Sequence, residues 1–167
     1  MKGKIFLKSI AFGFFVVIYN TDCQIPATGS DLPSLSGLHW GMSMQEVKDR
    51  MHRDMKGEGN TAITFQDSFM NSNVHVTLTF GEADTEKGLR FIEIQFDNTN
   101  AKKLLAYLKT RYGDKCETEK KEKSKLFFTV NIEASKWSLK NESVVMIVFS
   151  QGDQVLSLSL VYKKKGR

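Results

Sequence analysis

The side chains that could act as nucleophiles or metal ligands are few in this sequence and lie far apart. The three histidines are His39, His52 and His75, and no two of them have the HExxH or HxH spacing of a metal site. The cysteines are Cys23 and Cys116. Cys116 stands between a lysine and a glutamate, and no nearby histidine would activate its thiol, so we expect a free thiol rather than a nucleophile.

No other pattern predicts catalysis or a bound cofactor. A phosphate cradle needs a glycine-rich turn that opens a helix, but Gly57 and Gly59 follow a predicted helix. His75 could meet Glu93 across a sheet, which is an ordinary surface contact. We therefore expect no catalytic residue, no cofactor and no metal ion, and we favour binding over catalysis.

The N-terminal segment has the pattern of an export signal. Lysines precede an apolar run over 10–19, which is about half the length that a membrane-spanning helix needs. We expect a signal peptide over 1–23 that is cleaved between Cys23 and Gln24, and the alternative is lipidation of Cys23. The mature protein is then periplasmic or extracellular and has no transmembrane segment.

Length, charge and composition favour one small domain. The chain has 167 residues and a formal net charge of +5, without a basic stripe interleaved with aromatic residues, so we expect no nucleic-acid partner. The composition predicts a flexible leader over 24–36, a single domain over 37–163 and a basic tail over 164–167. In 115–125 the charges alternate in sign, which predicts a solvated loop or a frayed extension.

Two segments carry the signals of capped helices. Ser43 and Glu46 have the spacing of a capping box, and an apolar stripe of valine and methionine continues this helix to Met55. The second helix is expected over 100–112, after an asparagine-rich N-cap segment, and it ends at Gly113.

The remaining apolar segments alternate with period two, as strands do. Three strands are expected between the helices, over 61–69, 74–80 and 89–96. Further strands are expected over 126–133, 136–140, 144–150 and 156–162. The sequence therefore predicts an α+β fold, a twisted antiparallel sheet with two helices on one face in the order α-βββ-α-βββ(β), with a possible duplication.

One face of this sheet is a candidate interaction surface. If the helices cover the face that holds Leu160 and Val130, the alternation sends a set of apolar residues to the opposite face. This candidate interaction patch consists of Phe91, Phe127, Ile147, Phe149 and Val161. Such patches commonly bind partners, although the leader over 24–36 or the segment 115–125 could also cover this one.

Several local motifs resemble those of known proteins. The motifs are Trp40-Gly41-Met42-Ser43 with Glu46-Val47, then Tyr112-Gly113, and finally Trp137 with Val161-Tyr162. Together they resemble a broad group of uncharacterised secreted bacterial α+β domains with a "WGMS…EV" helix start and a "YG" helix end. The Gly41, Met42, Ser43 and Val47 subset is also similar to the helix start of small outer-membrane assembly lipoproteins and of β-lactamase-inhibitor-like domains. The resemblance implies a fold rather than a chemistry.

Two function classes are compatible with these patterns. The first is an extracytoplasmic binding or interaction module whose partner is an envelope or extracellular protein. The alternative is a secreted or periplasmic hydrolase whose site is assembled from distant residues, with His75 and Cys116 as the positions to test.

Overall fold

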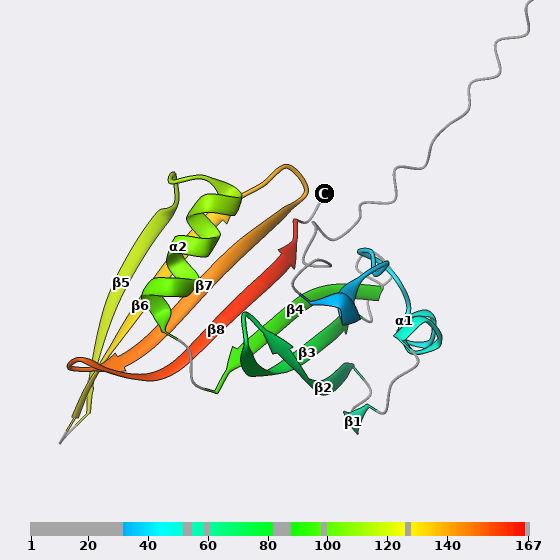
Figure 1. Ribbon diagram of the computed structural model, residues 1–167, viewed down its shortest axis with the longest axis horizontal. Helices are drawn as coiled ribbons and strands as arrows, with labels where there is room; N and C mark the ends of the chain where they lie inside the picture. Colours follow the sequence, from blue (N-terminus) through cyan, green and yellow to red (C-terminus); the bar gives the residue numbers. More distant parts are fainter. Residues whose placement is uncertain are drawn as a thin grey trace, which may run out of the picture.

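The computed structural model describes residues 32–51, 55–58, 61–81, 88–97, 100–125 and 128–165. The described chain forms one antiparallel sheet with the strand order β1-β2-β3-β4-β8-β7-β6-β5, together with two helices (Figure 1). Apart from the three-residue strand β1, the elements follow the order α-βββ-α-ββββ, so the predicted α+β class is confirmed. The predicted signal peptide and Phe127 lie outside the described residues.

The chain builds two similar halves. The first contains a short 3-10 helix, η2 (Pro33–Leu35), then α1 (Met44–Met51), β1 (Lys56–Glu58), β2 (Ala62–Phe69), β3 (Ser72–Gly81) and β4 (Gly88–Phe96). The second contains α2 (Ala101–Tyr112), β5 (Glu117–Lys125), β6 (Phe128–Ser138), β7 (Glu142–Gln151) and β8 (Gln154–Lys164). Each half is a helix followed by a meander, and the halves join where their last strands, β4 and β8, pair with each other.

The predicted capping box at the start of α1 is confirmed. The backbone N–H of Ser43 donates to Glu46 Oε2 at 2.7 Å, and the backbone N–H of Glu46 donates to Ser43 Oγ at 3.2 Å. The predicted helix is too long, however, because α1 ends at Met51 and Met55 lies outside it. The segment that follows Met55 pairs as β1 with β2, which requires the chain to leave the helix earlier.

Helix α2 matches its prediction closely. Asn100 is the N-cap, and its side chain accepts from the backbone N–H groups of Lys102 and Lys103. Gly113 closes the helix at φ 93°, where its N–H donates to Lys109 O at 2.8 Å. Leu104 and Leu108 are fully buried, and burying each such side chain stabilises the fold by about 1.5–3 kcal/mol.

One face of the sheet holds the core. A row of directly opposed side chains crosses the sheet on this face, and every member is at most 1% exposed: Ile63, Leu78, Ile92, Tyr162, Val144 and Trp137. Val47 of α1 and Leu104 and Leu108 of α2 belong to the same buried cluster. Both helices therefore cover this side, which we call the helix-bearing face, and the other side is the helix-free face.

Strand β5 corrects the predicted loop over 115–125. Glu117–Lys125 pairs along its whole length with Phe128–Lys136 of β6. Its described side chains, residues 117–124, are all exposed, so the strand buries no apolar row and shows no hydrophobic alternation. A strand of this kind alternates only in charge, which resembles the pattern of a solvated loop.

Strand β6 merges two predicted strands and reverses one predicted face. Phe128–Ser138 is continuous, and Ile132 lies opposite Phe149 while Trp137 lies opposite Val144. Burying Trp137 on the helix-bearing face turns the even-numbered residues of β6 away from it, because side chains alternate along a strand. Val130 therefore lies on the helix-free face, and the prediction that placed it under the helices is wrong.

The end of the predicted leader is part of the packed structure. Leu32 is 0% exposed and Leu35 is 2% exposed, so these two side chains belong to the buried core. Further along, Leu89 N donates to Met42 O at 2.7 Å and Gly41 N donates to Leu89 O at 3.0 Å. These bonds fasten the segment before α1 to the start of β4. At this contact the backbones approach so closely that a Cβ on Gly88 would lie 2.1 Å from Gly41 O.

Candidate functional site

The helix-free face carries a continuous run of apolar side chains across three adjacent strands. Register places Val161 opposite Val145, Ile147 opposite Ala134, and Phe149 opposite Ile132. All six side chains are partly exposed. We call this set the apolar stripe: Val161, Val145, Ile147, Ala134, Phe149 and Ile132. Near its Phe149 end, at the start of β8, Val155 and Leu156 are 43% and 49% exposed.

Three of the predicted patch residues belong to this stripe. Ile147, Phe149 and Val161 lie together in it. Phe91 is on the same face but outside the stripe, because it pairs with Lys163, whose Nζ lies 5.2 Å from the centroid of the Phe91 ring. Sequence patterns missed Val145, Ala134 and Ile132. β7 is apolar on both faces, Ala134 falls in a predicted gap between strands, and Ile132 shares the predicted face of Val130, under the helices.

Charged pairs border the stripe on the β5 side. Lys136 Nζ lies 3.6 Å from Glu117 Oε2, and Lys121 Nζ lies 2.7 Å from Glu119 Oε1. An apolar centre with a charged, solvated rim is the usual anatomy of a protein interface. The register of β5, β6 and β7 therefore gives this face the layout of a docking surface.

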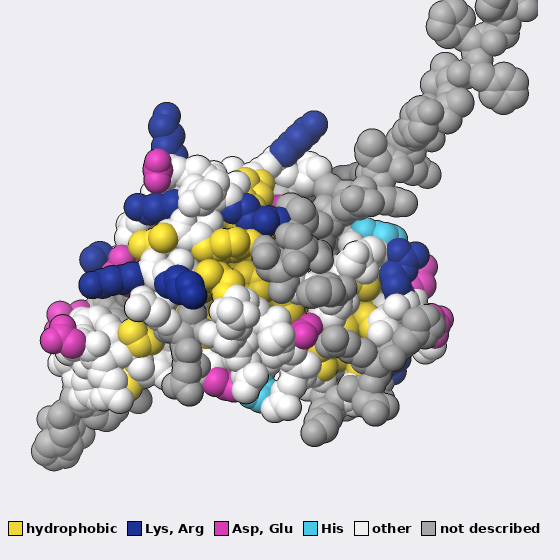
Figure 2. All heavy atoms as spheres, viewed as in Figure 1, with side chains coloured by type: hydrophobic (Ala, Val, Ile, Leu, Met, Phe, Trp, Pro, Cys, Tyr) yellow, Lys and Arg dark blue, Asp and Glu magenta, His cyan; other side chains and the backbone are white. Residues whose placement is uncertain are grey.

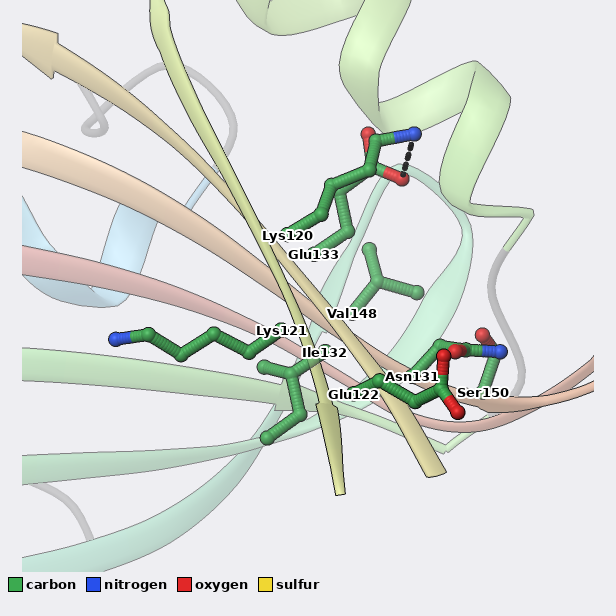
Figure 3. A pocket seen from close by; sticks show the side chains of 8 residues that line it. All are labelled: Lys120, Lys121, Glu122, Asn131, Ile132, Glu133, Val148 and Ser150. Atoms are coloured by element: carbon green, nitrogen blue, oxygen red, sulfur yellow. Dashed lines mark ion pairs between the residues drawn. The ribbon is translucent and has the colours of Figure 1, made fainter. Parts of the chain in front are cut away.

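The helix-bearing face has a hollow beyond α2, at the far end of β5, β6 and β7. The hollow has a volume of about 480 Å³ and is lined by Lys120, Lys121, Glu122, Asn131, Ile132, Glu133, Val148 and Ser150. Figure 3 shows that Lys121 and Ile132 point away from the other lining side chains. Lys120 Nζ lies 3.2 Å from Glu133 Oε2, and these side chains are 73% and 43% exposed. Because this pair is solvated and already neutralised, the hollow offers little binding energy for a small ligand.

Hydrophobic side chains are also visible on the helix-bearing face. Figure 2 shows them at the centre of this face, with Lys and Arg side chains around them. On α2, Leu105, Tyr107 and Tyr112 are partly exposed and pack against the core. The guanidinium of Arg111 lies 6.0 Å from the ring centroid of Tyr107 and 5.9 Å from that of Tyr112. An arginine that packs on two rings covers apolar surface while it keeps its charge in water.

A buried carboxyl group lies at the start of β7. Glu142 is 5% exposed, and Trp40 Nε1 donates to its Oε2 at 3.1 Å. Burial raises the pKa of Glu142 to about 7, although the Trp40 N–H acts in the opposite direction. Sequence patterns placed Glu142 in a turn. Its position two residues before Val144 was the available signal, because period two puts both side chains on the buried face.

Several aromatic residues that the sequence motifs singled out lie close together near this carboxyl group. Trp137 Nε1 donates to Gly113 O at 2.9 Å, and the ring centroids of Tyr112 and Trp137 are 6.4 Å apart. Tyr162 lies opposite Val144, in the same buried row as Trp137. Burial raises the pKa of the Tyr162 hydroxyl well above its ordinary value. The cluster thus contains two buried groups whose raised pKa favours the protonated form, and its hydrogen bonds join the Trp40 segment and the end of α2 to the sheet.

The cluster contains one group suited to acid–base chemistry, the Glu142 carboxyl, but that group is not accessible to a substrate. A carboxyl group with a pKa near neutrality can hold and release a proton. Catalysis also requires access to a substrate, and the side chain of Glu142 is nearly inaccessible. Its contact with Trp40 is a structural one, since it joins residues far apart in the sequence.

The structure does not bring the predicted hydrolase positions together. His75 is on β3 and Cys116 immediately precedes β5, and four strands lie between β3 and β5 in the sheet. His75 does not meet Glu93, which lies opposite Thr77; instead its Nε2 is 3.4 Å from Asp97 Oδ1. Cys116 forms no disulfide within the described residues.

Two further findings concern the described residues only. Within the described ranges, no group of three or more His, Cys, Asp or Glu side chains could hold a metal ion. No helix of the described part is long and apolar enough to cross a membrane.

Comparison with protein families, curated proteins and solved structures finds no match for this chain. A functional inference therefore rests on the geometry of the apolar stripe and of the Glu142 cluster.

Proposed function

We propose that this protein is an extracytoplasmic binding module that docks a protein partner on its apolar stripe. The observation that carries the proposal is the register of β6, β7 and β8, which places six partly exposed apolar side chains side by side on the helix-free face. Contiguous apolar patches on a protein surface commonly mark interaction sites.

The partner's chemistry follows from the shape and borders of the stripe. A sheet face is broad, and of the six stripe residues only Ile132 also lines the hollow, so the stripe suits a protein surface better than a small molecule. The partner should present apolar side chains at the centre of its contact area. It should present polar or charged groups toward the pairs Lys136–Glu117 and Lys121–Glu119. The export signal expected over 1–23 would place such a partner in the cell envelope or outside the cell.

The test begins with a photoreactive residue on the stripe. Ser157 lies opposite Phe149 and is itself polar, so a benzophenone amino acid at position 157 reports what contacts this end of the stripe. The crosslinked partner is identified and purified. Its dissociation constant is then measured for the unaltered protein, for Phe149→Ser and for Phe91→Ser.

Phe91→Ser is the matched control, because it makes the same change on the same face but outside the stripe. We expect Phe149→Ser to weaken binding by about tenfold or more, as hot-spot aromatic residues do, and Phe91→Ser to have little effect. Both variants should keep the unfolding temperature of the parent. Equal affinities for Phe149→Ser and its parent would overturn the proposal, and so would a large loss of stability in Phe149→Ser, which would show that the stripe belongs to the core.

A further inference from the structure

The outer edge of β5 is a second surface with recognisable partner chemistry. β5 is the last strand in the sheet order, and among the described strands it pairs only with β6. An edge strand offers unpaired backbone N–H and C=O groups to any strand that can lie beside it. β5 is also long, at nine residues, and its described side chains are exposed on both faces.

The charge pattern of this edge is complementary to itself. If a second copy of β5 lies antiparallel to the first with Lys121 opposite Lys121, then Glu119 falls opposite Lys123 and Lys120 falls opposite Glu122. The same register sets Thr118 opposite Ser124, and at the ends it sets position 117 opposite position 125. Each of these pairs occurs twice because of the twofold symmetry, whereas the like-charge pair of Lys121 with Lys121 occurs once, on the axis. Opposite charges and Thr–Ser pairs are the favourable cross-strand combinations.

Other registers are worse. Antiparallel pairing about a twofold axis keeps each side chain on its own face, so the register can shift only in steps of two residues. Centring the pairing on Glu122 would set Lys121 opposite Lys123 and Glu122 opposite itself. Centring it on Lys120 would pair Glu119 with Lys121 and Glu117 with Lys123, but it would lose the Lys120–Glu122 pairs and set Thr118 opposite Glu122.

We propose that the partner of the β5 edge is a second copy of this chain, paired antiparallel about Lys121. Lysines on an edge strand ordinarily discourage pairing, because like charges directly opposite each other are destabilising. Here the helix-free face of β5 carries glutamates at 117 and 119 and lysines at 121 and 123, so an antiparallel second copy sets lysine against glutamate. The two sheets then become one continuous sheet, and the twofold axis keeps both helix-free faces on the same side.

A charge-swap experiment tests the proposal on the purified full chain by sedimentation equilibrium. Lys123→Glu makes position 123 repel Glu119 of the second copy, and Glu119→Lys makes position 119 repel Lys123 of the second copy. We expect each variant alone to weaken dimerisation by roughly tenfold or more, since two symmetry-related pairs change from attraction to repulsion. An equimolar mixture of the two variants should restore the dimer as a heterodimer, because every altered pair is again of opposite charge.

The control is Lys102→Glu, a reversal of the same kind on the exposed surface of α2, which should leave the dimer unchanged. Register is tested in a Cys116→Ser background. Lys121→Cys should form a disulfide between copies, since directly opposed Cβ atoms lie within about 5.5 Å, whereas Lys123→Cys should not. A protein that stays monomeric at every concentration, a dimer that ignores the charge reversals, or crosslinking at position 123 instead of 121 would each overturn the proposal.

Discussion

At the scale of single residues, Glu142 is the group whose chemistry departs most from that of a free side chain. It is buried, it accepts from Trp40, and its pKa is raised to about 7. An acid whose pKa is higher in the folded than in the unfolded state holds its proton more tightly when folded. Its contribution to stability is therefore largest at acidic pH, and it declines as the pH rises from about 4.5 through 7.

Glu142→Gln should remove this pH dependence. The amide oxygen can still accept from Trp40, but no charge has to be buried at alkaline pH. At pH 8 we expect the variant to be more stable than the parent by about 1–3 kcal/mol; at pH 5 the two should be nearly equal. Urea unfolding at both pH values measures the difference, with Glu93→Gln on an exposed site as the control. An identical pH dependence in parent and Glu142→Gln would show that the carboxyl group is not the source.

Gly88 is a second residue whose replacement has a defined cost. A Cβ at this position would lie 2.1 Å from Gly41 O, and the backbone has φ +83°. We expect Gly88→Ala to destabilise the fold by about 3 kcal/mol or more. The Gly41 backbone would have to move, and alanine would have to adopt a strained positive φ. Gly152→Ala is the comparison, because φ there is +55° with no atom within 4 Å, so only about 1 kcal/mol of conformational cost is expected. Similar losses in thermal unfolding would contradict the role of the close approach.

At the scale of elements, the sequence predicts best those segments that bury an apolar row. Strands β2, β3, β4 and β8 were located by hydrophobic alternation, and both helix starts by their caps. Strand β5 was not predicted, because its described side chains are exposed on both faces and its sequence therefore shows no hydrophobic alternation. The prediction for Val130 was wrong because the orientation of β6 is set at its other end. There Trp137 is buried on the helix-bearing face, and its Nε1 donates to Gly113 O.

The candidate site was predictable only in part, because part of it depends on strand register rather than on local alternation. Ile147, Phe149 and Val161 alternate with polar or buried neighbours and could be assigned to one face. Which residues complete the stripe depends on how β6 and β7 are aligned, and register is a property of two strands rather than of one. Glu142 and Trp40 are distant in the sequence, so no local pattern could pair them.

Helix α1 is short, and its stability should depend on its cap and on one buried side chain. Ser43→Ala removes the acceptor for the N–H of Glu46 and should cost about 1 kcal/mol. Val47→Ala removes fully buried methyl groups and should cost roughly 1–3 kcal/mol. Gln45→Ala, on the exposed side of α1, should change the free energy of unfolding by less than about 0.5 kcal/mol. Thermal unfolding checks all three, and a neutral Ser43→Ala would contradict the importance of the capping box.

At the scale of the whole molecule, the two halves are arranged symmetrically about the β4–β8 pair, and the sheet ends in β1 on one side and β5 on the other. The two proposals use neighbouring parts of this arrangement. The apolar stripe occupies the face of the second half and the proposed dimer contact lies at the β5 edge, and both involve the charged residues Glu117, Glu119 and Lys121 of β5.

Export is also a property of the whole molecule. We expect N-terminal sequencing of the protein recovered from the cell envelope or the medium to begin at Gln24, because an apolar run of signal-peptide length ends shortly before this position. Recovery of a chain that begins with a lipid-modified Cys23 would contradict this cleavage site.

The pairing of β4 with β8 also has a kinetic consequence. Every other neighbouring pair in the sheet is formed by consecutive strands, so the loops that these pairs close are short and cost little chain entropy. The pairing of β4 with β8 instead closes a loop that contains α2, β5, β6 and β7. Non-local pairings of this kind slow folding, so we expect each half to assemble its hairpins first and the β4–β8 pairing to form last. Until the halves join, β4 and β8 each have an edge with unpaired backbone N–H and C=O groups. Other chains can pair with these edges, so we expect aggregation to be greatest in this interval.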